Sequence, residues 1–322
     1  MRILITGATG YLGRTLVLAF RNAGHETVAF SRRASASGVP GDVFDGDVRD
    51  LAALERAVSG CDGVCHSAAL VSVWRKQRDE FDAVNVGGLE NVLAAARAAR
   101  ITRILYTSSF LALPPNGAEV PGRWNDYQRT KVAADKTASR AVAEGVPLIR
   151  AYPGVIYGPG ALTEGNLVGG MIRDHLAGRL PGVIGADRVW SYAWVEDVAR
   201  GHVAALERAE AGARYVLGGE NAPQMRLFEI VRELTGRRLP RRIPAAVGVM
   251  VGALEELKAT LTGRPPLLTA GTVEVLTRDW AMDSSLAIRD LGYVVTPLRE
   301  GIARVIATLQ ADAPQPPEGR TS

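Results

Sequence analysis

Short apolar runs alternate with amphipathic segments along the first half of the chain. Five of the runs lie at residues 3–5, 27–30, 63–66, 103–108 and 146–152. Runs of this length are typical of strands buried in a parallel sheet. Between them, residues 51–58 and 89–99 have apolar positions three and four apart, which predicts helices. The alternation therefore predicts an α/β fold built on a parallel sheet.

This alternation fades after residue 160. Strands are predicted at 189–194 and 214–217, and helices at 166–177, 196–209, 227–235, 245–261, 267–277, 284–292 and 298–309. Residues 245–254 are the most apolar stretch of this half, but they are too few to span a bilayer, so a buried or interfacial helix is expected there. The tail 311–322 contains three prolines and is predicted to be disordered.

Composition narrows the class of protein. The 322 residues are 47% hydrophobic and 22% charged, with a formal charge of only +4 and scattered basic residues. We expect a globular protein with no nucleic-acid partner and no integral membrane segment. Two cysteines and no signal peptide before the first strand favour a cytoplasmic location. Cys61, Cys65 and His66 lack further ligands at suitable spacing, so no metal site is expected.

A glycine-rich turn separates the first strand from the first helix. Gly7, Gly10 and Gly13 stand three residues apart between them, which is the context that a dinucleotide-binding turn requires. Gly7 permits the tight turn, Gly10 lets a pyrophosphate approach the helix start, and Gly13 permits close helix packing. The alternative is an ordinary glycine-rich turn without a ligand.

Residues after the second and third strands bear on the choice of dinucleotide. Ser31, Arg32 and Arg33 occupy the position where an acidic residue would bind the ribose of NAD. Arginines favour a 2′-phosphate by charge and bidentate geometry, so NADP(H) is favoured and NAD(H) stays open. The alternative is a pair of solvated loop arginines. Asp47 is placed to accept a hydrogen bond from the adenine amino group.

Candidate acid–base residues follow the fifth strand. That strand delivers Thr107 and Ser109 to the carboxyl edge of the sheet, where open α/β sheets hold their ligands. Tyr127 and Lys131 are four apart and share one face of a predicted helix. A neighbouring ammonium should lower the tyrosine pKa, so that Tyr127 can exchange a proton with an alcohol or carbonyl. The alternative is a surface helix pair.

Several of these motifs together carry a resemblance to a known family. The glycine turn, Asp47-Val48, Ser109 and Tyr127-x-x-x-Lys131 resemble those of the extended short-chain dehydrogenase/reductases, that is, the NAD-dependent epimerase/dehydratase family. Stretches 152–156 and 178–182 look most like the dihydroflavonol-reductase-like branch, similar to plant farnesol dehydrogenase. Asn125-Asp126 stands before Tyr127 where many relatives carry a proline.

The resemblance implies a Rossmann-type doubly wound sheet at 1–160, to which segments of 189–218 return, and a smaller, mainly helical substrate domain at 161–310. It implies Tyr127 as acid/base, Ser109 as hydrogen-bond partner of the reacting oxygen, and Lys131 as the group that holds the nicotinamide ribose. Further cofactor contacts are expected from the turn and the strand ends: Thr9, Tyr11, Leu12, Val48, Ala68, Ala69, Asn85, Thr107, Tyr152, Pro153 and Val155.

Three functions remain open. The first is hydride transfer between NAD(P) and an apolar alcohol or carbonyl, isoprenoid-, flavonoid- or steroid-like, with Phe110, Leu111, Trp190 and Tyr192 as an apolar wall or as ordinary core. The second is a nucleotide-sugar epimerase or dehydratase, with Arg179 and Arg188 as a diphosphate clamp. The third is a non-catalytic dinucleotide sensor. We expect a small-molecule substrate, and a homodimer stays open.

Overall fold

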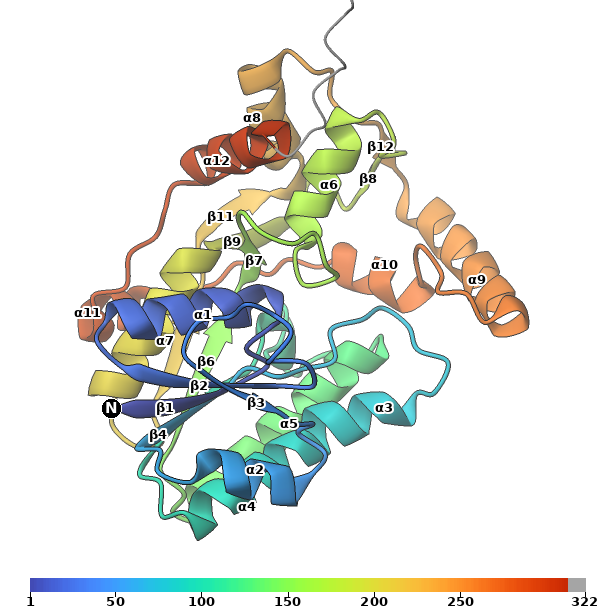
Figure 1. The fold of residues 1–322 in the computed structure, drawn as a ribbon. Coiled ribbons are helices and arrows are strands. Elements are labelled where there is room, and N and C mark those ends of the chain that lie inside the picture. The colour runs from blue at the N-terminus through green and yellow to red at the C-terminus, as the bar shows by residue number, and fades with distance from the viewer. Residues whose placement is uncertain (312–322) are drawn as a thin grey trace, which may run out of the picture.

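The fold, a computed structural model in which residues 1–311 are described, is organised around a seven-stranded parallel sheet (Figure 1). Its strand order is β10-β6-β5-β4-β1-β2-β3. The strands are β1 (Arg2–Thr6), β2 (Glu26–Ser31), β3 (Asp42–Asp45), β4 (Gly63–His66), β5 (Arg103–Thr107), β6 (Leu148–Pro153) and β10 (Arg214–Leu217). The predicted Rossmann-type sheet is confirmed, and the order reverses beside β1, where such sheets bind their ligands.

Helices cover both faces of this sheet because its strands are apolar on both sides. Along β1, Ile3 and Ile5 join one buried cluster and Leu4 joins the other, as alternation along a strand requires. One face packs against α1 (Tyr11–Asn22), α7 (Val195–Arg208) and α11 (Ser285–Leu291). The opposite face packs against α2 (Leu51–Val58), α4 (Gly88–Ala98) and α5 (Asp126–Ala143). Figure 1 shows the two layers on either side of the sheet.

The second half of the chain adds a smaller sheet and further helices above the carboxyl edge of the large sheet (Figure 1). Strands β7 (Val155–Tyr157), β9 (Val189–Trp194) and β11 (Glu220–Pro223) form it in the order β11-β9-β7, and β8 (Val183–Ile184) pairs with β12 (Arg242–Ile243). The helices are α6 (Leu167–Leu176), α8 (Gln224–Thr235), α9 (Ala245–Thr262), α10 (Ala270–Leu276) and α12 (Leu298–Ala311). A third buried cluster joins these elements except β12 and α9.

Most predicted elements are present within a few residues of their expected ends, with two differences. Strand 189–194 lies in the small sheet, whereas 214–217 is the edge strand of the large one. Helix α12 continues through Ala311, where the tail was expected to begin, and the rest of that prediction lies outside the described residues. In residues 1–311, no helix has both the length and the apolar character needed to cross a membrane. The boundary at residue 160 stays a prediction.

Candidate active site

The glycine turn has the close contacts that its sequence predicts. Gly7 adopts φ +71°, and a Cβ there would lie 2.7 Å from the backbone of Ala68 on the neighbouring strand end. A Cβ on Gly13 would lie 2.0 Å from the Gly7 carbonyl, so only glycine fits. Gly10 is the exposed N-cap of α1, with nothing closer than 3.1 Å to a Cβ. The turn therefore leaves the unpaired N–H groups of α1 open to an anion. Thr9, Tyr11 and Leu12 surround it and are partly exposed.

The end of β2 carries an unsatisfied polar group. The Ser31 hydroxyl is buried and has no hydrogen-bond partner among the described residues, whereas the side chains of Arg32 and Arg33 are exposed beside it. A buried hydroxyl without a hydrogen-bond partner lowers the stability of the protein unless a ligand supplies that partner. This site fits the ribose or 2′-phosphate of a dinucleotide. Asp47, expected at the adenine, binds Arg49 through both oxygens, at 3.0 and 2.7 Å.

Three strand ends meet below the turn. Thr6 is opposite His66 in register, and His66 is opposite Tyr106. The Thr6 hydroxyl and His66 Nδ1 are 2.7 Å apart, and the imidazole stacks on the Tyr106 ring. Burial lowers the pKa of His66 to about 3, with the charge of Lys131 acting in the same direction. His66 is therefore a neutral structural histidine at neutral pH.

The catalytic candidates come from two adjacent segments. Tyr127 and Lys131 lie on α5, whose N-cap Asn125 accepts a hydrogen bond from the Gln128 N–H. Ser109 follows β5, its hydroxyl accepts from the Leu111 N–H at 3.2 Å, and it lies within hydrogen-bonding reach of the phenol. Tyr127 keeps partial exposure, as a group that meets a ligand must. The structure thus brings Ser109, Tyr127 and Lys131 to one place at the carboxyl edge of the sheet.

The pKa of Tyr127 is raised, not lowered, in the protein itself. Burial raises it to about 12, and the hydrogen bond from Ser109 opposes this rise. Lys131 does not counter it, because the Lys131 ammonium donates to the carbonyl of Thr107 at 2.9 Å and to the Tyr106 hydroxyl at 3.5 Å. The protein without its cofactor thus does not show the lowering of the Tyr127 pKa that was expected from Lys131, because desolvation raises this pKa and the Ser109 hydrogen bond alone opposes the rise. A lowering with the nicotinamide bound stays a prediction.

Lys131 is itself deeply buried, with 3% of its surface exposed. Burial lowers its pKa to about 8, and the nearby carboxylate of Asp135 opposes the fall. Asp135 also accepts a hydrogen bond from the Ser108 hydroxyl at 3.1 Å. Sequence analysis missed Asp135, although it stands four residues beyond Lys131 on the face of α5 that already carries Tyr127. The repeated spacing of four was the available signal.

Asn85 connects the two sides of the site. It lies in a short π-helix (Ala83–Gly87) between α3 (Asp79–Asp82) and α4, and π-bulges are frequent at functional sites. Its carboxamide accepts from the Leu70 N–H at 2.7 Å and donates to the Thr130 hydroxyl at 2.9 Å. Asn85 therefore ties the loop after β4 to the catalytic helix. A direct contact between Asn85 and the cofactor stays a prediction.

The chain carries the pattern of a known family. Residues 3–218 match the family model described as "NAD dependent epimerase/dehydratase family". The matched range includes the glycine turn, Ser109, Tyr127 and Lys131. The chain belongs to the NAD dependent epimerase/dehydratase family. It is accordingly an enzyme of the extended short-chain dehydrogenase/reductase type, as the resemblance predicted.

Relatives of this epimerase/dehydratase-family enzyme have varied names. "Sterol demethylase protein B" of Methylococcus capsulatus is 30% identical, over 95% of this chain and 98% of the relative. "Putative dihydroflavonol 4-reductase" of Synechocystis sp. is 27% identical, over 95% of this chain and 94% of the relative. The structure of MoeE5 in complex with UDP-glucuronic acid and NAD is 25% identical, covers 97% of this chain and 100% of that chain, and has a TM-score of 0.76. The dihydroflavonol-reductase-like branch is confirmed, while similarity to farnesol dehydrogenase stays a prediction.

The aromatic residues proposed to line a substrate site are mostly buried. Trp190 and Tyr192 are 4% and 1% exposed, within the core of the small sheet. Phe110 keeps partial exposure and packs against the rings of Trp190 and Trp280, at centroid distances of 6.1 and 5.2 Å. Leu111 is buried beside it. The expected wall on β9 is thus largely core, and Phe110 is the member that can meet a ligand.

The other expected cofactor contacts are unevenly placed. Ala68 and Ala69 are partly exposed beside the turn. The Thr107 hydroxyl is hydrogen-bonded to His202 Nε2 at 3.0 Å, and its carbonyl accepts a hydrogen bond from the Lys131 ammonium. The ring of Tyr152 is fully buried under the guanidinium of Arg214. Three more residues are buried: Val48, Pro153 and Val155. For Tyr152 and these three, a cofactor contact stays a prediction that their burial does not favour.

Proposed function

We propose that this enzyme transfers a hydride between NADP(H) and an apolar alcohol or carbonyl compound of isoprenoid, flavonoid or steroid type. The observation that carries the proposal is the grouping of Ser109, Tyr127 and Lys131 at the carboxyl edge of the sheet, beside the glycine turn. That edge is where open α/β sheets bind dinucleotides.

The residues around the turn fit the dinucleotide. Gly10 and the start of α1 receive the pyrophosphate, and Ser31 with Arg32 and Arg33 receives the adenosine ribose and its 2′-phosphate. The Lys131 ammonium has three N–H donors, of which Thr107 and Tyr106 take two, so one remains for the nicotinamide ribose. The nicotinamide, when bound, supplies or accepts the hydride.

Tyr127 moves the proton. In the reducing direction its hydroxyl gives a proton to the substrate oxygen as the carbonyl carbon gains the hydride. In the oxidising direction the tyrosine takes that proton back as the alcohol carbon loses the hydride. A pKa of about 12 keeps Tyr127 protonated at neutral pH, which suits the reducing direction. Ser109 holds the reacting oxygen in place and its hydrogen bond stabilises the phenolate once the proton has left, and Lys131 adds to this only with the dinucleotide bound.

The apolar substrate class rests on two observations. Phe110 follows the catalytic serine directly and is the exposed member of an aromatic cluster. The names of two relatives point to a sterol and a dihydroflavonol, which are both largely apolar. Hydrophobic and aromatic side chains with a few polar groups are the usual lining of sites for such molecules.

A nucleotide-sugar epimerase or dehydratase is the second candidate, because MoeE5 was solved with UDP-glucuronic acid and NAD. Both arginines expected to clamp a diphosphate are already engaged with carboxylates. Arg179 donates to Asp174 at 2.8 Å and Arg188 to Asp279 at 3.1 Å. The missing clamp favours the apolar substrate. A dinucleotide sensor is disfavoured, since it has no need of an acid–base tyrosine.

A substrate panel tests this proposal. Purified enzyme is incubated with NADPH or NADH and a set of isoprenoid, flavonoid and steroid carbonyls, and separately with nucleotide sugars. We expect NADPH oxidation with at least one apolar carbonyl, and the same rate in Arg188→Ala. Turnover of nucleotide sugars alone, lost in Arg188→Ala, would transfer the assignment to the epimerase or dehydratase. A cytoplasmic location remains part of the proposal, and the oligomeric state stays open.

A further inference from the structure

Helix α9 carries a stripe of large apolar side chains on its outer face. This set, which we call the α9 stripe, consists of Val247, Met250, Leu254, Leu257 and Leu261. Their exposures are 42, 59, 61, 59 and 79%, and Leu267 in the following loop is 92% exposed. The spacing of three and four residues places all five on one side of the helix. Exposed apolar patches of this kind mark interaction sites.

The opposite side of α9 is fixed to the rest of the protein. Gly248, Gly252 and Ala259 are buried there, and a Cβ on Gly252 would lie 2.6 Å from the Ala270 nitrogen. The two acidic residues of the helix also face inward: Glu255 accepts from the Leu267 N–H and Glu256 from the Ala270 N–H. The packing leaves the stripe outward and free of negative charge. Figure 1 shows α9 at the margin of the molecule, beyond α10.

Positive charge is concentrated around this helix. Residues 237–267 contain six basic and two acidic side chains, an excess of four that equals the formal charge of +4 of the whole chain. Three of these arginines, at 237, 238 and 241, form what we call the arginine cluster. None of the three has an ion-pair partner within residues 1–311. Arg241 precedes the start of α9 by four residues, a reach of at most about 14 Å.

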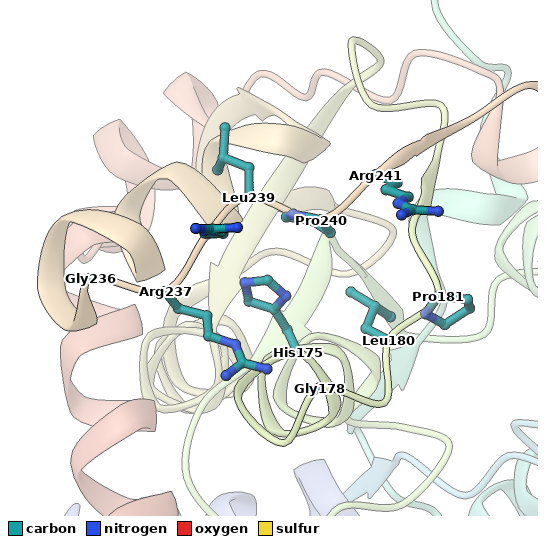
Figure 2. A pocket seen from close by; sticks show the side chains of 10 residues that line it. His175, Gly178, Leu180, Pro181, Gly236, Arg237, Leu239, Pro240 and Arg241 are labelled. Atoms are coloured by element: carbon teal, nitrogen blue, oxygen red, sulfur yellow. The ribbon is translucent and has the colours of Figure 1, made fainter.

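The arginine cluster lines an open pocket of about 500 Å³ at the C-terminal end of α6. Figure 2 shows Arg237 and Arg241 on opposite sides of His175 in this pocket. His175 is 5% exposed, and its Nε2 has no hydrogen-bond partner in the described part of the chain. A buried nitrogen without a partner beside unpaired guanidinium groups is suited to a phosphate oxygen.

The distribution of charge around α9 discriminates between a lipid bilayer and a second copy of the chain as the partner that covers the α9 stripe. Basic residues lie at both ends of α9, with the arginine cluster before it and Arg264 just after it, while Lys258 pairs with Glu255 at 3.3 Å. Two copies packed stripe to stripe would place like charges together whether the helices ran parallel or antiparallel. The anionic lipids of a membrane surface instead complement both ends.

We propose that the α9 stripe and the arginine cluster form a membrane-docking surface for anionic bilayers. The stripe lies in the interfacial layer of the bilayer, and the arginines bind lipid phosphates, as an in-plane apolar helix with basic flanks does. The helix does not span the membrane. Binding to the bilayer is independent of which substrate the active site accepts.

Flotation with vesicles tests the proposal on the full-length enzyme. Vesicles of phosphatidylcholine with phosphatidylglycerol should carry the wild type to the top of the gradient, and pure phosphatidylcholine should carry much less. Leu254→Glu with Leu257→Glu should lower binding by about tenfold or more. Arg237→Ala with Arg238→Ala should also lower it, by about 25-fold, since each arginine contributes about fivefold.

Matched variants show whether the effect is local. Val120→Glu changes an apolar side chain that is 71% exposed elsewhere, and Arg56→Ala with Arg97→Ala removes two exposed arginines from α2 and α4. Both should bind vesicles as the wild type does. Sedimentation velocity without lipid should give wild type and the stripe variant the same mass. A wild type that ignores anionic vesicles, or a dimer that the stripe variant dissociates, would overturn the proposal.

Discussion

Lys131, Tyr127 and His66 lie within one buried region, and their protonation states follow from desolvation more than from their neighbours. Burial lowers the pKa of the two bases, to about 8 for Lys131 and about 3 for His66, and raises that of the phenol to about 12. In each case burial shifts the pKa toward the neutral form, but Lys131, with a pKa of about 8, is still an ammonium at neutral pH. The protein alone therefore holds a protonated tyrosine as a ready acid.

The neutral state of His66 predicts how stability changes with pH. The unfolded chain takes up a proton near pH 6.5, but folded His66 does so only near pH 3, so stability falls as pH falls between these values. From pH 7 to pH 5 this loss amounts to about 2 kcal/mol. Replacing His66 with Gln should reduce the loss, measured by urea unfolding at both pH values. Equal losses in the two proteins would show that His66 is not held neutral.

The 2′-phosphate assignment belongs to Arg32 and Arg33. Each charge-assisted contact contributes about 1.5–3 kcal/mol. Replacing both with Ala should therefore narrow the NADP over NAD preference by about tenfold or more, measured by the Kd of each dinucleotide. Arg56→Ala, on the exposed side of α2, is the control and should leave the preference unchanged. A wild type that binds NAD more tightly would refute the assignment.

Sequence spacing predicts which site residues share a face of a helix or strand, but it does not predict how they are packed. Tyr127 and Lys131 are four apart on a helix, so their shared face could be predicted from sequence alone. The direction in which the Tyr127 pKa shifts could not be predicted, because it depends on how much protein surrounds the phenol and on where the Lys131 ammonium points. Trp190 and Tyr192 share a face of β9 as predicted, but spacing could not tell whether that face meets a ligand or the core.

At the scale of elements, the turn between β1 and α1 contains one glycine that is needed for folding and another that is expected to serve dinucleotide binding. Gly13 is required by packing, since a Cβ would lie 2.0 Å from the Gly7 carbonyl, whereas Gly10 is exposed. Gly13→Ala should thus destabilise the protein by about 1–3 kcal/mol, the usual cost of overpacking. Gly10→Val should keep the unfolding midpoint near that of wild type and lose dinucleotide binding. Calorimetric titration and urea unfolding of both variants check this contrast. Tight binding by Gly10→Val would mean that the pyrophosphate lies elsewhere.

Several strands of the parallel sheet were predictable because each is followed by a helix with its own apolar period, as β1 is by α1 and β3 by α2. The π-helix at Ala83–Gly87 was not, since a single extra residue in a helical turn leaves no mark on that period. Strand β11 was also missed. It pairs antiparallel with β9, and its residues Glu220–Pro223 have no apolar run of their own.

On the scale of the whole molecule, the large sheet supplies the dinucleotide and acid–base residues, and the small sheet and its helices cover the carboxyl edge (Figure 1). Ser109 and Phe110 stand at the junction, since one faces Tyr127 and the other packs against Trp190 and Trp280. This arrangement places an apolar group beside the proton donor. This arrangement supports the proposed redox chemistry on an apolar carbonyl.

The central claim is that Tyr127 transfers the proton that accompanies hydride transfer, and Tyr127→Phe tests it most directly. This change keeps the ring and removes the hydroxyl, as Tyr215→Phe does on the distant edge strand β10. Turnover of NADPH with the best apolar carbonyl should fall by at least ~10²-fold in Tyr127→Phe while the Kd for NADPH stays nearly constant. Tyr215→Phe should match the wild type. Turnover in Tyr127→Phe within a few-fold of wild type would contradict the mechanism.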